Sequence, residues 1–429
     1  MLASEFDYHL PAELIAQEPV EPRDHSRLLR LRRSDGAVEH YRFYELPQLL
    51  RPDDLLVFND TRVLRARLRG HKVLSEALSG TANVDTEGTG TQKPQVQSHM
   101  AGQPGARVEA LLLREIETNL WEALLKPSAR LRPGTPLSFT ARDSSASVAA
   151  TAVERTKIGW IVRFFGADIR GLLPQLGEVP LPPYITAALR DEERYQTIFA
   201  RSASRTTPTY NTSAAIESGV SAEPNTSAPL AGTSVAFDSA AAPTAGLHFT
   251  PALLEALRSG GIRTAFVTLR IGIGTFRPIQ SETIEEHVMH EEEFEISEET
   301  ALAIAEQRRR GGRVVAVGTT TTRVLEAASI GNGEVAPGPG RTSLFISPGY
   351  RFRSVDALLT NFHLPRSSLL VMIAAFVQNS EGSASGRGLE DVAATTPRLP
   401  GLEKVGYAYS EAIRMRYRFF SFGDAMLIE

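Results

Sequence analysis

The chain has 429 residues, of which 42% are hydrophobic and 22% charged, and its formal net charge is −4. This length suggests two or three domains, and the charge balance offers no overall attraction to nucleic acid, so any such contact must be local. Cysteine is absent, which excludes disulfides, a thiolate nucleophile and cysteine-ligated metal.

Two polar clusters lie in the N-terminal region, each beside an apolar segment: Glu21–Asp24 and Asn59–Arg62. Loops that carry such side chains at the ends of buried elements are how α/β enzymes assemble a site. Arginines also gather near both clusters, which favours a local contact with an anionic partner. The same arginines also fit a solvated face.

Short β-like runs separated by turn signals follow between Arg107 and Phe165, and they predict an antiparallel meander or small barrel. We expect this domain at residues 63–159, inserted into a larger α/β domain of residues 1–62 and 160–429. Three stretches rich in Ser, Thr, Gly, Ala and Pro are expected to be flexible insertions: 75–104, 202–234 and 379–400.

The predicted helices and strands of the large domain are best defined after residue 250. Thr250 and Ser297 are predicted N-caps of two helices, and strands are expected at 264–271 and from Val314. This alternation indicates βαβ units with largely parallel strands, whose ligands bind beyond the carboxyl ends of the strands. We therefore expect an α/β fold, with a large barrel-like α/β domain and a small inserted antiparallel β-barrel.

The run from Val314 to Arg323 passes from an apolar strand through Gly318 into four threonines. It predicts a helix N-terminus, where free N–H groups and the helix dipole favour a phosphate or carboxylate. A threonine-rich helix cap without a ligand is the alternative.

Three further clusters could carry chemistry. Pro243–His248 precedes the Thr250 helix, 360–366 carries Asn361, His363 and Arg366, and 417–428 places Asp424 among aromatic residues. The first two offer histidines for proton transfer, and the third offers a carboxylate whose pKa aromatic walls would tune.

Two other motifs each fit more than one interpretation. Gly272 and Gly274 end a strand, which allows a ligand to approach closely but equally fits a bulge. The segment 286–293 contains His287, His290 and Glu291, a conceivable metal set, although the spacing differs from that of zinc proteases and also fits a solvated acidic loop.

Apolar segments do not point to a membrane. The longest apolar run, Leu369 to Val377, is far shorter than the roughly 20 residues that span a bilayer, and the N-terminus lacks the pattern of a signal peptide. We expect a cytoplasmic protein that makes no membrane contact.

Along its whole length the sequence resembles one family, the S-adenosylmethionine:tRNA ribosyltransferase-isomerases of queuosine biosynthesis. The matching stretches include FDYHLPAELIAQEPVEPRDHSRLL from Phe6, LLVFNDTRVLRARL from Leu55, APTAGLHFT from Ala242, VVAVGTTTTRVLE from Val314, DALLTNFHLPRSSLL from Asp356 and YRFFSFGDAMLI from Tyr417. The chain departs from the family pattern at Arg270, where members usually have histidine, and this strand position is therefore left out of the catalytic set.

The resemblance implies transfer and isomerisation of the ribosyl group of S-adenosylmethionine, a co-substrate, onto 7-aminomethyl-7-deazaguanine at the wobble position of tRNA. The products would be epoxyqueuosine-tRNA, adenine and methionine. The tRNA is expected to carry a GUN anticodon, the enzyme to be a monomer, and no metal to be needed.

The resemblance also selects site residues. Acid and base are expected among His248, His290, Glu291, His363 and Asp424. Substrate binding is expected at Arg23, Asp24, Asn59, Asp60, Thr61, Arg62, Thr244, Gly246, Gly274, Thr275, Thr320, Thr321, Thr322, Arg323, Asn361 and Arg366. Two other hypotheses are a metal-dependent hydrolase that uses His287, His290 and Glu291, and a tRNA-binding protein without catalysis.

Overall fold

A computed structural model describes residues 1–74, 103–142, 146–187, 189–201, 238–272, 278–378 and 400–429. The expected insertion at 202–234 lies outside these residues, as do most of the other two. Two expected insertion limits are wrong, because Gln103 and Pro104 belong to a strand and Pro400 begins a helix.

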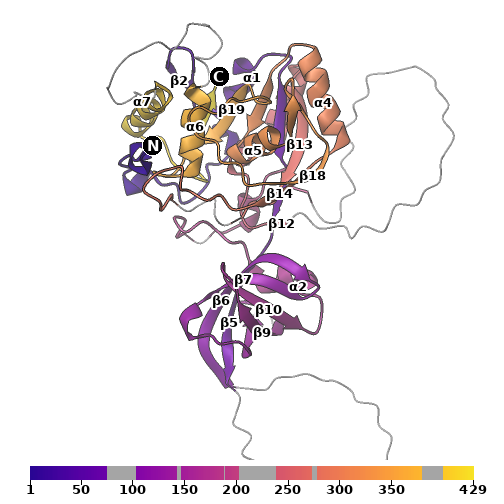
Figure 1. Cartoon of the computed structure of the whole chain (residues 1–429). Coiled ribbons are helices and arrows are strands. Elements are labelled where there is room, and N and C mark those ends of the chain that lie inside the picture. The colour runs from indigo at the N-terminus through magenta and orange to yellow at the C-terminus, as the bar shows by residue number, and fades with distance from the viewer. Residues whose placement is uncertain (75–102, 143–145, 188, 202–237, 273–277, 379–399) are drawn as a thin grey trace, which may run out of the picture.

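The large part of the molecule is built on a nine-stranded mixed sheet (Figure 1). Its strand order is β18 (Gly338–Thr342), β14 (Glu292–Ile296), β13 (Arg263–Leu269), β3 (Leu55–Asn59), β15 (Val314–Val317), β19 (Ala357–Asn361), β20 (Ala425–Ile428), β1 (Arg27–Leu31) and β2 (Val38–Arg42). The central strands β13, β3, β15 and β19 are parallel, as predicted. Within the described residues β18 and β2 are the two end strands of this sheet, and the predicted α/β class is confirmed.

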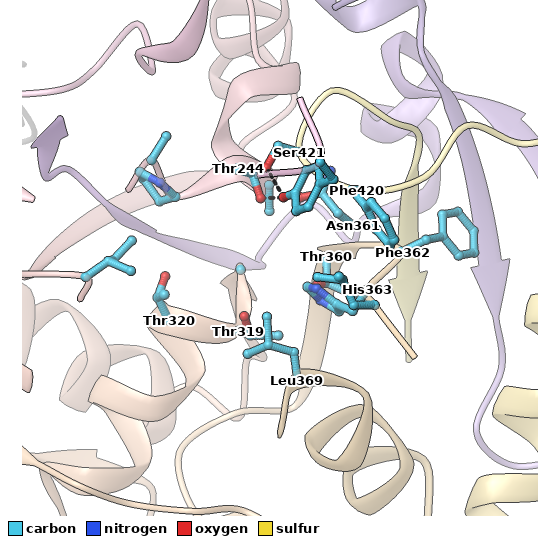
Figure 2. A pocket seen from close by; sticks show the side chains of 17 residues that line it. Thr244, Thr319, Thr320, Thr360, Asn361, Phe362, His363, Leu369, Phe420 and Ser421 are labelled. Carbon is cyan, nitrogen blue, oxygen red and sulfur yellow. Dashed lines mark hydrogen bonds between the residues drawn. The ribbon is translucent and has the colours of Figure 1, made fainter. Parts of the chain in front are cut away.

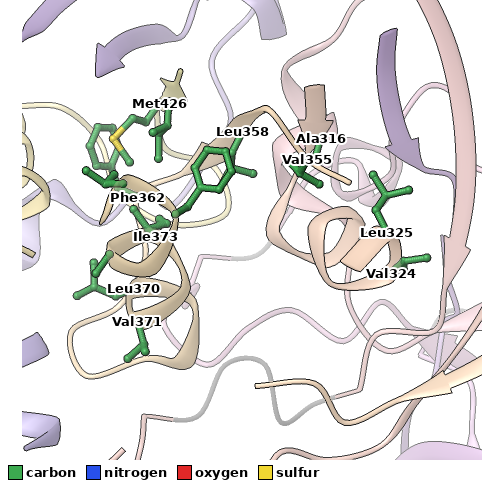
Figure 3. Packing of buried hydrophobic residues seen from close by; sticks show 14 of the residues in the cluster. Ala316, Val324, Leu325, Val355, Leu358, Phe362, Leu370, Val371, Ile373 and Met426 are labelled. Atoms are coloured by element: carbon green, nitrogen blue, oxygen red, sulfur yellow. The ribbon is translucent and has the colours of Figure 1, made fainter. Parts of the chain in front are cut away.

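Helices cover both faces of the sheet because its central strands are apolar on both sides. Side chains from α4 (Glu298–Arg309), α5 (Thr319–Ala327), α6 (Ser368–Gln378) and α7 (Pro400–Arg414) share one core with strand residues such as Ala316 and Leu358 (Figure 3). The opposite face packs against α3 (Pro251–Ser259) and the short α1 (Leu46–Leu49).

The two predicted helix caps are confirmed. Thr250 Oγ1 accepts a hydrogen bond from the N–H of Leu253 at 3.1 Å, and Ser297 Oγ accepts one from the N–H of Thr300 at 3.1 Å. Each satisfies a first-turn N–H that has no partner inside its helix.

The small domain is a closed antiparallel barrel, which confirms that part of the fold prediction. Its order is β11 (Gly177–Glu178), β5 (Arg67–Leu74), β6 (Gln103–Glu117), β7 (Leu120–Lys126), β10 (Trp160–Phe165), β9 (Ser147–Arg155) and β8 (Thr135–Thr140), and β5 pairs with β8 to close it. Closure needs Gly70, since a Cβ there would lie 2.1 Å from the carbonyl oxygen of Ser138.

The expected domain boundary at residues 159 and 160 is wrong. Strand β10 pairs with β7 and β9, and Trp160, Val162 and the α2 helix (Ile169–Leu176) pack into the barrel core. The barrel therefore extends to Glu178. Within the described residues no helix is long and apolar enough to cross a membrane.

Sheet register gathers distant segments at one edge. The parallel strands β3, β15 and β19 all end there, and the antiparallel β20 begins opposite, with Ala425 paired to Asn361. Strand β1 runs parallel to β20, with Leu28 beside Ala425. The loops before β1 and β20 and after β3, β15 and β19 therefore meet at this edge.

Candidate active site

A pocket opens at this sheet edge and holds about 540 Å³ of empty space, including its solvent-open mouth. Figure 2 shows Thr244, Phe420 and Ser421 on one side and Thr319, Thr320 and Leu369 on the other. The remaining lining side chains come from the loops after β15 and β19 and from nearby turns: Tyr184, Ala242, Pro243, Ala245, Ile271, Gly318, Thr360, Asn361, Phe362, His363 and Leu364. Among the described residues that line it there is no Asp, Glu, Lys or Arg.

A chain of hydrogen bonds runs from the pocket wall into the core. The Thr244 hydroxyl donates to Asn361 Oδ1 at 2.9 Å, and the Asn361 amide donates to His248 Nε2 at 3.0 Å. His248 Nδ1 then carries the proton and donates it to Ser26 Oγ at 2.7 Å. The His248 ring also stacks on Phe43, with ring centroids 4.8 Å apart.

Burial fixes the charge of His248. Its side chain is buried, and desolvation, assisted by the positive charges of Arg418 and Arg23, lowers its pKa to about 3. The imidazole is therefore neutral near pH 7, and it orients Asn361 without lining the pocket itself.

His363 lines the pocket directly. Its Nε2 lies 2.8 Å from Thr360 Oγ1, and among the described residues no hydrogen bond ties its Nδ1. Its backbone is held on both sides, because the Tyr8 hydroxyl donates to its carbonyl and its N–H donates to the Tyr409 hydroxyl at 3.1 Å. Burial lowers the pKa of His363 to about 3, so this imidazole is also neutral.

The threonine-rich helix N-terminus is real, but its four threonines differ in role. Gly318 has a φ of 97° and turns the chain from β15 into α5, and Thr319 and Thr320 face the pocket. Thr321 Oγ1 instead donates to the carbonyl of Val317 at 2.8 Å, and Thr322 Oγ1 to that of Gly318 at 3.2 Å. Thr321 and Thr322 are buried and do not line the pocket.

Arg323 makes a buried ion pair instead of facing the pocket. Its guanidinium contacts the Glu292 carboxylate and donates to the carbonyl of Leu344 at 3.2 Å, and only 3% of the arginine is exposed. Glu292 also accepts the N–H of Gly272 at 3.0 Å. The pair joins α5 to the edge of β14, which is a structural function.

Asp424 closes a loop at the sheet edge. Its carboxylate accepts the backbone N–H of Arg27 at 2.9 Å and that of Arg418 at 2.7 Å, and Arg27 Nε lies 3.3 Å away. It is 2% exposed and is not among the pocket-lining residues. These contacts favour a positioning role for Asp424, and its expected catalytic role stays a prediction.

The cluster after β3 is buried and internally bonded. Asn59 Oδ1 accepts the N–H groups of Thr61 and Leu269, each at 3.1 Å. Asp60 accepts the Thr268 hydroxyl at 2.6 Å and pairs with Arg201, while burial raises its pKa. Asn59, Asp60 and Thr61 therefore hold the strand ends in register beside the pocket and do not line it.

Other expected binding residues are not among the described lining residues of the pocket. Arg23 donates to the carbonyl of Gln196 at 2.7 Å, Asp24 accepts the Thr250 hydroxyl at 2.6 Å, and Arg62 pairs with Glu193 at 2.6 Å. Arg366 has a φ of 54° in the turn before α6.

Gly246 is required by packing, since a Cβ there would lie 2.8 Å from the Phe199 ring. Gly274 and Thr275 lie outside the described residues. His290 and Glu291 are exposed and do not line the pocket, and Glu291 pairs with Arg341 at 3.3 Å. Within the described ranges no three His, Asp or Glu side chains are placed to hold a metal ion.

Sequence reasoning missed several site residues. Tyr184, Thr360, Phe420 and Ser421 line the pocket, and Ser26 completes the His248 chain. The only available signal was their position beside predicted motifs, such as Thr360 before Asn361.

Fold and pocket together define an α/β protein whose pocket lies where small organic substrates usually bind and has no charged side chain among its described lining residues. A family model described as "Queuosine biosynthesis protein" matches residues 3–214, 234–385 and 392–428. S-adenosylmethionine:tRNA ribosyltransferase-isomerases from Pelotomaculum thermopropionicum and Symbiobacterium thermophilum are 42% and 40% identical, with 100% of each chain covered. A crystal structure of S-adenosylmethionine tRNA ribosyltransferase from Thermotoga maritima is 33% identical over 99% of this chain and 100% of that chain, with a TM-score of 0.46.

The chain therefore belongs to the family of S-adenosylmethionine:tRNA ribosyltransferase-isomerases, the transferase-isomerases of queuosine biosynthesis.

Replacing Asp424 tests its positioning role. Asp424→Ala leaves two buried N–H groups without an acceptor, so we expect the free energy of unfolding to fall by about 2–5 kcal/mol. Urea denaturation followed by circular dichroism measures it, with the surface variant Glu255→Ala as control, expected within about 0.5 kcal/mol of the original chain. An Asp424→Asn protein with unchanged stability but no activity would instead restore the catalytic assignment.

The two buried histidines make stability pH-dependent. The unfolded chain binds a proton at each below its ordinary pKa of about 6.5, whereas the folded pKa values are about 3. Stability is therefore lost as pH falls from about 6.5 towards 3, by about 2 kcal/mol per histidine at pH 5. Urea midpoints between pH 7 and pH 4.5 measure the slope, which His363→Gln should make shallower by about one proton. An unchanged slope would mean that His363 is protonated in the folded protein.

Proposed function

We propose that this protein transfers and isomerises the ribosyl group of S-adenosylmethionine onto 7-aminomethyl-7-deazaguanine at the wobble position of tRNA. Epoxyqueuosine-tRNA forms, and adenine and methionine leave. The observation that carries the proposal is the pocket itself, which combines neutral His363 with a helix N-terminus and aromatic side chains in a chain of this family.

The reaction needs a base and an acid. The sulfonium acidifies the adjacent carbon, a base must take a proton there, and the departing adenine must receive one. Two titratable side chains line the pocket among the described residues, His363 and Tyr184. Burial raises the pKa of the Tyr184 phenol, so we assign the proton transfer to His363. His290 and Glu291 are exposed and are not among the described lining residues, and Asp424 accepts hydrogen bonds from backbone N–H groups.

The low pKa of His363 does not oppose this role. Burial lowers this pKa because a new charge is poorly solvated there. When the base takes a proton from the carbon beside the sulfonium, an imidazolium forms and the substrate becomes a sulfonium ylide with no net charge. The net charge in the pocket stays the same, so the desolvation penalty that lowers the pKa is partly offset.

The helix N-terminus of α5 offers a place for the methionine carboxylate. The first N–H groups of a helix have no partners inside it, and Thr319 and Thr320 bring them to the pocket wall. The chain from Ser26 through His248 fixes the Asn361 amide, and thereby the Thr244 hydroxyl, on the opposite side.

We assign the tRNA contact to arginines around the pocket. Arg23, Arg62 and Arg366 are candidates, and Arg62 can exchange its exposed pairing with Glu193 for a phosphate. A tRNA with a GUN anticodon is the expected substrate, and we expect the enzyme to act in the cytoplasm, where such tRNA is found.

Adenine release tests the reaction. The purified protein is incubated with S-adenosylmethionine and tRNA that carries 7-aminomethyl-7-deazaguanine, and free adenine is measured by chromatography. We expect release only with that tRNA and not with tRNA that carries guanine at the same position. Binding without adenine release would leave the alternative of a tRNA-binding protein without catalysis.

His363→Gln tests the proton-transfer assignment. Glutamine keeps a polar side chain but cannot exchange a proton, so we expect the single-turnover rate to fall by about 10²–10⁴-fold while S-adenosylmethionine still binds. His290→Gln is the matched control, because this exposed histidine lies outside the pocket, and its rate should be unchanged. Loss of activity in the His290 variant alone would reverse the assignment.

A further inference from the structure

Two aromatic side chains form one wall of the pocket. Tyr184 and Phe420 both line it, and their ring centroids are 4.7 Å apart with the rings tilted by 50°. Tyr184 is half-buried, whereas Phe420 is 4% exposed. The two residues come from distant parts of the chain, and the wall exists only in the folded protein.

Both residues are held in place. The Tyr184 hydroxyl is 2.7 Å from Ser421 Oγ, and its carbonyl accepts the Gln17 amide at 2.9 Å. Gln17 Oε1 in turn accepts the N–H of Thr186 at 2.8 Å. The segment that carries Tyr184 is thereby fixed against the N-terminal region.

Phe420 stands in a strained backbone conformation. Its φ is 71°, in the left-handed region that costs a non-glycine residue about 1–3 kcal/mol. The Phe420 N–H donates to the carbonyl of Phe362 at 3.1 Å, and its own carbonyl accepts the N–H of Gly423 at 3.0 Å. A Cβ on Gly423 would lie 2.5 Å from the carbonyl oxygen of Arg418, so the loop closes only with glycine there. The strained backbone at Phe420 and the glycine at position 423 together place the Phe420 ring in the pocket wall.

The pocket lining makes the wall the available partner for a cation. No described lining residue is a carboxylate, and burial raises the pKa of Tyr184, which keeps it a neutral phenol. A cationic ligand group bound in such a pocket can contact hydroxyl oxygens and the electron-rich faces of the aromatic rings. Aromatic faces attract a cation without forming the strong ion pair that a carboxylate would make.

We propose that Tyr184 and Phe420 form the subsite for the sulfonium of S-adenosylmethionine. This inference rests on the proposed function, and it adds the part of the pocket that recognises the positive charge of the substrate. The alternative occupant of the wall is the adenine ring, which would stack on the aromatic pair without using its affinity for charge.

Comparing a charged ligand with its neutral counterpart separates these occupants. S-adenosylhomocysteine has the same nucleoside and amino acid but a neutral thioether in place of the sulfonium. Isothermal titration calorimetry with the full chain gives the affinity ratio of the two ligands for the unmodified protein, Tyr184→Leu and Phe420→Leu. We expect the unmodified protein to prefer S-adenosylmethionine and each leucine variant to lose roughly 2- to 30-fold of that preference.

Controls distinguish ring loss from general damage. Tyr184→Phe keeps the ring but loses the hydroxyl bound to Ser421, and it should retain the preference. Tyr44→Leu removes an exposed tyrosine outside the pocket, which stacks near His25 with ring centroids 5.2 Å apart, and its ratio should also be unchanged. Thermal unfolding of each variant confirms that it is folded.

The outcomes are separate from those of the reaction test. Equal weakening of both ligands in Tyr184→Leu and Phe420→Leu, with their ratio unchanged, would overturn the proposal and assign the wall to adenine. An unmodified protein that binds both ligands equally would also overturn it. Neither result depends on the tRNA-dependent release of adenine, which tests the proposed function by itself.

Discussion

The geometry of the site depends on the hydrogen bonds that the Asp424 carboxylate accepts. It binds the N–H of Arg27, at the start of β1, and the N–H of Arg418, in the loop before β20. One buried side chain therefore joins the two ends of a long chain at the sheet edge. Ser26 precedes Arg27 and meets His248, while Phe420 lies inside the loop that Asp424 closes. Displacement of this carboxylate would disturb the hydrogen-bond chain through His248 and the loop that carries Phe420 at once.

A second constraint is electrostatic. Charged side chains near the pocket are already paired: Arg323 with Glu292, Asp60 with Arg201 and Asp424 with Arg27. The described lining residues contribute hydroxyls, one side-chain amide, a neutral imidazole, aromatic rings and aliphatic groups. Such groups can hold a charged substrate without trapping it as a strong ion pair, and low polarity strengthens every remaining interaction. Because these charged side chains are paired with one another outside the lining, the described lining side chains can all be neutral.

Sequence patterns predicted what depends on local chemistry. The caps at Thr250 and Ser297, the strand at Val314 and the barrel all follow from residues close together in the chain. The roles of Thr321 and Thr322 could not be predicted, because a threonine hydroxyl near a helix start can face a ligand or its own backbone with similar ease. The predicted domain boundary was wrong because it divided the β-like pattern, which continues to Phe165. Only tertiary pairing and packing show that the barrel also includes α2 and ends at Glu178.

The two sides of the pocket favour ligand groups of opposite charge. The N-terminus of α5 brings partial positive charge to the side of Thr319 and Thr320, and Phe420 lies on the other side (Figure 2). Phe420 and its neighbour Tyr184 bring the partial negative charge of aromatic rings to the lining. A ligand with a carboxylate at one end and a cation further along can satisfy both only in one direction. His363 lies at the loop between β19 and α6, so this direction also decides which ligand atoms meet the imidazole. In the proposed reaction, two weak fields would thus orient the substrate and place the proton transfer, with no charged side chain among the described lining residues.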